Sequence, residues 1–188
     1  MRVGTIKNNN KMKITKLFTV LTIALLLSVA ITSCKNEPSA ECVQLEKADK
    51  QLAANLKMYE TVWDEIVNKR KIDEINETNF DKNITLVSFP ENIVGIAAFK
   101  DYYNNFLVGF SNISFTIVDV FGQGDKIVKH WNFKGTHTGD FFGIPATGNE
   151  VDIDGVTLVK MKDGKIAQEQ DFMDNLDFYQ QLGLIPVE

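Results

Sequence analysis

The sequence has 188 residues, of which 44% are hydrophobic and 24% charged, a composition typical of a globular protein with about one domain. Residues 1–33 carry five cations and no acid, so residues 34–188 hold 15 Lys+Arg against 25 Asp+Glu, a net charge of −10. Nucleic acids bind basic faces, so this charge excludes them as expected partners. Two Cys and two His are too few for the usual zinc site unless all four converge on one ion, so we expect no metal.

Residues 1–33 have the pattern of a secretory signal peptide. A basic segment precedes an apolar run at 17–31, which is shorter than the roughly 20 residues that a membrane-spanning helix needs. Met12 opens a more usual signal than Met1, so the start of the chain stays open between the two.

The apolar run ends in Ile31-Thr32-Ser33-Cys34. This segment resembles the bacterial lipoprotein signal, in which an aliphatic residue and two small residues precede a cysteine. The resemblance implies that Cys34 is lipidated and that it anchors the protein in the bacterial cell envelope. The outer membrane is favoured because no Asp follows Cys34. The alternative is an ordinary signal peptide with a chance cysteine.

Hydrophobic periodicity predicts an α+β domain at 44–188, after a polar tether at 34–43. Spacings of three and four predict helices, and a spacing of two predicts strands. The predicted helices are 41–68, 72–77, 95–110 and 176–182. The predicted strands are 80–89, 115–121, 127–138, 151–162 and 165–173. Asp163-Gly164 is a strong hairpin signal, so the later strands are expected to form an antiparallel meander.

Four motifs follow one another in the second half of the chain. They are Gly135-Thr136-His137-Thr138-Gly139, Gly143-Ile144-Pro145-Ala146-Thr147-Gly148, Asp163-Gly164-Lys165-Ile166 and Gln181-Leu182-Gly183. In this order and spacing they resemble the SnoaL-like polyketide cyclases, the ester cyclase branch of the nuclear-transport-factor-2-like superfamily. The resemblance covers residues 45–186. It implies a curved antiparallel sheet that N-terminal helices wrap into a cone with an internal pocket, often as a homodimer.

The resemblance also implies catalytic residues. The family's general acid/base aspartate precedes the Gln-Leu-Gly segment by seven residues, which is Asp174 here. Desolvation in an apolar pocket raises the pKa of a carboxyl, which can then exchange protons with a carbon acid near neutral pH. The alternative is that Asp174 caps the terminal helix. Asp171 and Asp177 are expected at the surface.

His137 matches the histidine of the family motif and could donate a hydrogen bond to a developing enolate oxygen. Alternatively, it bonds the backbone around the bends at Gly135 and Gly139. Five aromatic residues could line a flat apolar cavity, although aromatic stripes on helices are more often core. They are Tyr59, Trp63, Tyr103, Trp131 and Phe142.

Two functions stay open. The first is an envelope-anchored, cofactor-free cyclase or isomerase, in which Asp174 removes an α-proton from a small, hydrophobic, enolisable molecule. The second is a non-catalytic lipoprotein of the same fold that binds a small apolar ligand. Intact Asp174 and His137 favour the enzyme. Gln168 and Gln170, which stand where the family usually has Glu and Trp, slightly favour the binding protein.

Overall fold

The structure, a computed structural model, describes residues 38–186. The chain divides into two units, 1–45 and 46–188, and the second unit carries the whole of the sheet described below. The predicted signal peptide and Cys34 lie outside the described residues. Within 38–186, no helix is both long enough and apolar enough to cross a membrane.

The described residues form three α-helices, one short 3-10 helix and six strands. The helices are α2 (Ala40–Val67), η1 (Ile72–Glu74), α3 (Ile96–Gly109) and α4 (Asn175–Gln181). The strands are β1 (Phe80–Leu86), β2 (Ile93–Val94), β3 (Phe110–Gln123), β4 (Lys126–His137), β5 (Glu150–Lys162) and β6 (Lys165–Met173). The predicted α+β class is therefore confirmed, and of the described elements only the two-residue strand β2 has no counterpart among the predicted ones.

The six strands form one sheet in the order β2-β1-β6-β5-β4-β3. The meander from β3 to β6 is antiparallel, as its hairpin signals predict. Strand β1, however, pairs with β6 in parallel, so the expected wholly antiparallel sheet is in fact mixed. The reason is connectivity, because β1 adds to the free edge of the last strand after the chain has passed through α3 and the meander.

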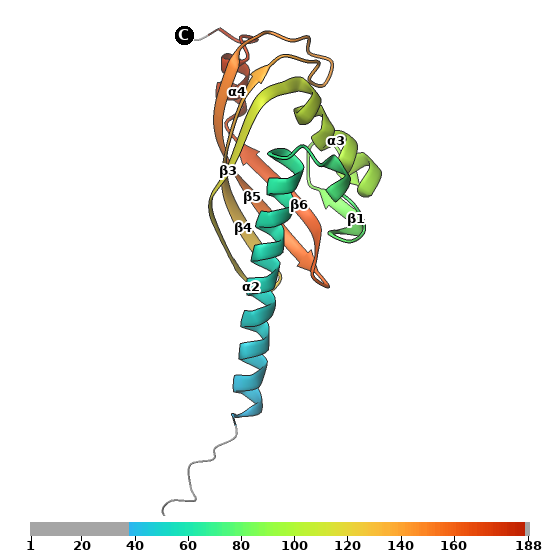
Figure 1. The fold of residues 1–188 in the computed structure, drawn as a ribbon, viewed down its shortest axis with the longest axis vertical. Helices are drawn as coiled ribbons and strands as arrows, with labels where there is room; N and C mark the ends of the chain where they lie inside the picture. Colours follow the sequence, from blue (N-terminus) through green and yellow to red (C-terminus); the bar gives the residue numbers. More distant parts are fainter. Residues whose placement is uncertain (1–37, 187–188) are drawn as a thin grey trace, which may run out of the picture. The chain divides into compact units, whose positions relative to one another are not determined.

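Strand β3 gives the sheet its curvature. Its pairing with β4 shifts register between Ser111 and Ser114 and again between Ile117 and Asp119, and such bulges bend a strand. Figure 1 shows β3 curving along one edge of the sheet, with α3 at the opposite edge beside β1. A hydrogen bond from Tyr59 of α2 to Glu169 of β6 ties the long helix to the middle of the sheet.

One face of the sheet carries the core. Along β4 and β5, alternate residues are buried, which is the pattern of a sheet with one covered face. On β4 this buried face holds Ile127, Lys129, Trp131 and Phe133. Lys129 is therefore a charged residue among apolar ones on the buried face of this strand.

Candidate active site

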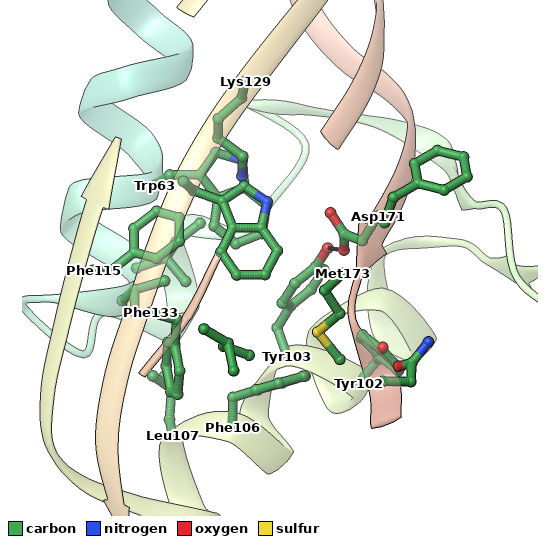
Figure 2. Close-up of a pocket in the computed structure, with 16 residues that line it drawn as sticks. Trp63, Tyr102, Tyr103, Phe106, Leu107, Phe115, Lys129, Phe133, Asp171 and Met173 are labelled. Carbon is green, nitrogen blue, oxygen red and sulfur yellow. Dashed lines mark hydrogen bonds between the residues drawn. The ribbon is translucent and has the colours of Figure 1, made fainter. Parts of the chain in front are cut away.

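A pocket of about 250 Å³ opens between the helices and the buried face of the sheet. Phe115, Phe133 and Leu107 lie on one side of it, and Asp171, Met173 and Tyr102 lie on the other (Figure 2). Most of the lining is aromatic or aliphatic, and Lys129 and Asp171 are its charged members. Such a lining fits a flat, apolar ligand with a few polar contacts.

Behind the pocket wall lies a fully buried carboxyl group, that of Glu169. Its Oε1 accepts hydrogen bonds from Tyr59 Oη at 2.6 Å and from Trp63 Nε1 at 3.1 Å, and its Oε2 lies 3.1 Å from Tyr103 Oη. Burial raises the pKa of Glu169 from 4.5 to about 7, although Lys129 and the two tyrosine hydroxyls oppose the shift. Glu169 therefore accepts a proton near neutral pH.

Asp171 is the carboxyl that faces the pocket itself. Its Oδ2 accepts a hydrogen bond from Tyr103 Oη at 2.9 Å, and its Oδ1 accepts one from Thr157 Oγ1 at 2.5 Å. The Thr157 hydroxyl in turn accepts a hydrogen bond from Trp131 Nε1 at 3.0 Å. Both carboxylate oxygens are thus held in place by groups on β5 and α3.

The hydroxyl of Tyr103 touches both carboxyl groups, and this contact limits their protonation. Burial, with Asp171 and Glu169 nearby, holds the pKa of Tyr103 well above its ordinary value, so the hydroxyl keeps its single proton. With one proton, the hydroxyl can donate one full hydrogen bond, to one carboxyl. It forms a second full hydrogen bond only if the other carboxyl is protonated and donates to the hydroxyl oxygen. Glu169 is the carboxyl whose burial favours the protonated form.

Lys129 supplies the positive charge of the pocket. Its Nζ lies 4.6 Å from the ring centroid of Trp63 and 5.2 Å from those of Tyr59 and Phe115, within the range of cation–π attraction. Burial lowers the pKa of Lys129, while Glu169 and Asp171 oppose that shift. The two nearby carboxyl groups thus favour the ammonium form of Lys129 that burial disfavours.

The structure does not bring Asp174 into this pocket. Asp174 is exposed, and its side chain caps α4 by accepting a hydrogen bond from the backbone N–H of Asp177 at 3.0 Å. The capping alternative thus describes its position. Asp171, expected at the surface, instead lines the pocket three residues earlier, whereas Asp177 is exposed as expected.

His137 lies in the core rather than in the pocket lining. It is fully buried, its Nδ1 is 3.1 Å from Thr147 Oγ1, and the backbone N–H of Thr147 points at the same nitrogen. Its ring packs against Phe110 with the centroids 5.2 Å apart. The contact with Thr147 joins the end of β4 to the following loop, so the geometry gives His137 a supporting position.

Of the five predicted aromatic residues, Trp63, Tyr103 and Trp131 line the pocket. Tyr59 lies behind the wall, where its hydroxyl bonds Glu169. Phe142 is 47% exposed and packs on Tyr102, whose ring does line the pocket.

Sequence reasoning missed Lys129, Glu169 and Asp171. The signal for Lys129 is its parity, since it alternates with the apolar residues Ile127 and Trp131 on the buried face of the strand. The signal for the two acids is hidden by a bulge in β6, where the pairing with β5 shifts between Lys160 and Met161. A bulge reverses which residues face the core, so strict alternation from Ile166 points to Gln168 and Gln170 instead.

Comparison with known proteins identifies the family of this chain. The SnoaL-like polyketide cyclase family matches residues 54–182. Aklanonic acid methyl ester cyclase DnrD of Streptomyces peucetius is 41% identical over 49 residues, which cover 26% of this chain and 34% of that enzyme. The alignment thus spans about a third of this curated relative.

Solved structures of similar fold cover far more of the chain. TsrD from Streptomyces laurentii superposes with a TM-score of 0.63 and 24% identity, covering 71% of this chain and 97% of TsrD. A structure from Jannaschia sp. CCS1, assigned to the SnoaL-like polyketide cyclases, superposes with a TM-score of 0.65 and 21% identity. The match covers 71% of this chain and 94% of that one. With the family match over most of its length, this chain belongs to the SnoaL-like polyketide cyclase family.

Proposed function

We propose that this chain is a cofactor-free cyclase or isomerase in which Asp171 exchanges a proton with the α-carbon of an enolisable carbonyl compound. One observation carries the proposal: a carboxylate held at both oxygens faces an otherwise largely aromatic pocket. Family membership supports the same class of reaction. Asp174 and His137, the residues that the sequence favoured, lie outside the pocket lining, so the proposal moves the proton transfer to Asp171.

The pocket favours this chemistry in two ways. Its aromatic walls exclude water and hold a planar substrate, which brings the α-carbon to a defined distance from the base. The hydrogen bonds from Tyr103 and Thr157 hold the carboxylate in one orientation. In the reaction, the α-proton passes to Asp171 and later returns to a carbon of the same molecule, so no cofactor is consumed.

The test uses 2-tetralone, a planar ketone with acidic α-protons, incubated with the protein in D₂O. We expect exchange of the α-protons above the buffer rate, followed by NMR. Asp171→Asn should lower this exchange by about 10²–10⁴-fold, the usual contribution of a general base. Asp174→Asn is the matched control, because the amide keeps a capping oxygen and lies outside the pocket lining; it should leave the exchange unchanged.

Two results would contradict the proposal. One is that Asp174→Asn loses the exchange while Asp171→Asn keeps it, which would favour Asp174 as the base, as the sequence predicted. The other is binding of 2-tetralone with no exchange above buffer, which would favour the non-catalytic binding protein. The apolar lining of the pocket is what supports that second candidate.

We also propose that the protein is anchored in the bacterial envelope through a lipid on Cys34. The support is the Ile31-Thr32-Ser33-Cys34 segment after an apolar run. A ligand pocket on an anchored domain would serve small hydrophobic molecules that pass through or lie in the envelope.

A further inference from the structure

Lys129 has no role in the proton transfer described above. Lys129 is only 3% exposed, yet among residues 38–186 its Nζ makes no salt bridge to a carboxylate within 4.0 Å and no hydrogen bond. The enclosed side-chain atom that lacks a partner in this part of the chain is His137 Nε2, so the Lys129 ammonium is not sealed off but borders the pocket that its side chain lines. A buried ammonium is expected to be paired, because an unpaired one loses hydration without compensation. Cation–π attraction to three aromatic rings offsets part of that loss. These rings do not replace the lone-pair acceptors that the N–H groups of the ammonium would have in water.

We infer that Lys129 is the oxyanion site of this pocket: its ammonium binds the carbonyl oxygen of the ligand and holds the negative charge that develops there. This inference rests on the proposed function and deepens it, because it names the group that the ligand presents to β4. The ligands it selects are flat, largely apolar molecules with an acidic oxygen, namely enolisable ketones and their enol or phenol analogues.

The placement of the two charges supports this inference. Lys129 and Asp171 both line the pocket, from β4 and β6, and they do not form an ion pair with each other (Figure 2). A planar carbonyl compound between them would present its oxygen to Lys129 and its α-carbon to Asp171. Trp63 and Phe115, which pack on the ammonium, would also contact the ligand, since both line the pocket.

The charges balance through the reaction. The α C–H bond breaks and its proton goes to the Asp171 carboxylate, while the electron pair moves through the new C=C bond to the carbonyl oxygen. The negative charge thus leaves Asp171 as it appears on the enolate oxygen beside Lys129. The pocket therefore gains no net charge, and the ammonium acquires a negative partner only when the enolate forms. Reprotonation of carbon reverses the transfer.

The test uses 4-nitrophenol, whose yellow phenolate band reports its ionisation and which needs no turnover. An opposite charge close by lowers the pKa of an acid by about 1–3 units. The wild-type protein should therefore bind 4-nitrophenol as the phenolate at a pH where the free compound is mostly neutral. Lys129→Met keeps the length of the side chain without its charge and should weaken phenolate binding by about tenfold or more.

Three controls make the result specific. Lys134→Met removes an exposed lysine from the same strand and should leave phenolate binding unchanged. Lys129→Arg keeps the charge and should retain the phenolate band, which answers the case in which Lys129→Met fails to fold. Nitrobenzene, which cannot ionise, should bind the wild type and Lys129→Met equally if the pocket is intact.

The inference is overturned if Lys129→Met, with nitrobenzene binding intact, binds the phenolate as tightly as the wild type does. It is also overturned if the wild type binds only neutral 4-nitrophenol. Asp171→Asn separates this test from that of the proposed function. That variant should keep the phenolate, because anion binding needs no base, even though it loses exchange of 2-tetralone. A phenolate bound at Lys129 with no exchange of 2-tetralone would refute the catalytic proposal and leave the oxyanion site standing.

Discussion

Glu169 illustrates how single residues set the charge of the pocket. It is a fully buried acid that is hydrogen-bonded to Tyr59, Trp63 and Tyr103; the two tyrosine hydroxyls favour its charged form, whereas burial favours its protonated form. Protonated, it donates to Tyr103, and the Tyr103 proton is then free to bond Asp171. A protonated Glu169 thus lets Tyr103 hold Asp171, the proposed base, through a full hydrogen bond.

The first prediction concerns the pH dependence of stability. Glu169 has a pKa of about 7 in the folded protein against an ordinary value of 4.5, so the folded state binds this proton more tightly. Stability should therefore fall as pH rises from about 4.5 to about 7, by on the order of 3 kcal/mol, and stay low above that range. Below pH 4.5 both states are protonated, so this stability is fully present and no longer changes with pH.

Glu169→Gln tests this reasoning. The amide imitates the protonated acid, since its oxygen can accept from Tyr59 and Trp63 while its NH₂ donates to Tyr103. The variant should be more stable than the wild type at pH 8 and about equal to it at pH 5, as measured by chemical denaturation. A variant that is less stable than the wild type at both pH values would contradict this, because it would show that the charged form of Glu169 stabilises the fold.

At the scale of elements, β4 and β5 together shape the pocket wall. Gly155 on β5 lies opposite Trp131 on β4, and a Cβ at Gly155 would be only 2.2 Å from Trp131 Cζ2. The indole of Trp131 lies over the glycine and donates to Thr157, which holds Asp171. The absence of a side chain at Gly155 therefore positions both an aromatic wall and, indirectly, the proposed base.

Gly155→Ala should be destabilising for this reason. The added methyl group must displace a large buried ring, and overpacking of this kind costs about 1–3 kcal/mol in unfolding free energy. Adding Trp131→Phe to Gly155→Ala should recover part of that loss, because the smaller ring leaves room for the methyl group. Denaturation of the two single variants and the double variant would check this, and additive losses would show that Gly155 does not act through Trp131.

The elements also show what sequence can and cannot predict. Strand β6 begins and ends where its alternation and the Asp163-Gly164 turn place it, because these signals are local. Strand β3 begins at Phe110, whose apolar spacing also fits the end of α3, so periodicity could not separate the two. The parallel pairing of β1 with β6 joins segments about eighty residues apart and has no local signature.

The site was harder to predict than the fold. Trp63, Tyr103 and Trp131 were found because large aromatic residues line most apolar pockets. Asp171 was missed because the bulge in β6 turns Glu169 and Asp171 inward, while simple alternation places the neighbouring glutamines there. The extra residue of this bulge thus moves the residues that follow it in β6 to the opposite face of the sheet.

For the whole molecule, the two ends of the sequence differ in chemistry. Residues 1–33 are basic and apolar, whereas residues 34–188 carry a net charge of −10. An acidic domain of this kind has no electrostatic attraction to anionic lipid surfaces. In the proposed arrangement, attachment to a membrane comes instead from the lipid on Cys34 in the N-terminal segment.

The last prediction tests that attachment. Acyl chains contribute about 0.8 kcal/mol per buried CH₂, so several chains on one cysteine hold a protein firmly on a bilayer. Cys34→Ser removes the atom that carries them, and we expect the variant to leave the membrane fraction of a bacterial host. Cys42→Ser is the matched control, because Cys42 is the other cysteine of the sequence and lies exposed in α2. It should stay with the membrane, and 4-nitrophenol binding should be equal in both variants. Membrane association that survives Cys34→Ser would contradict the anchor while leaving the pocket chemistry untouched.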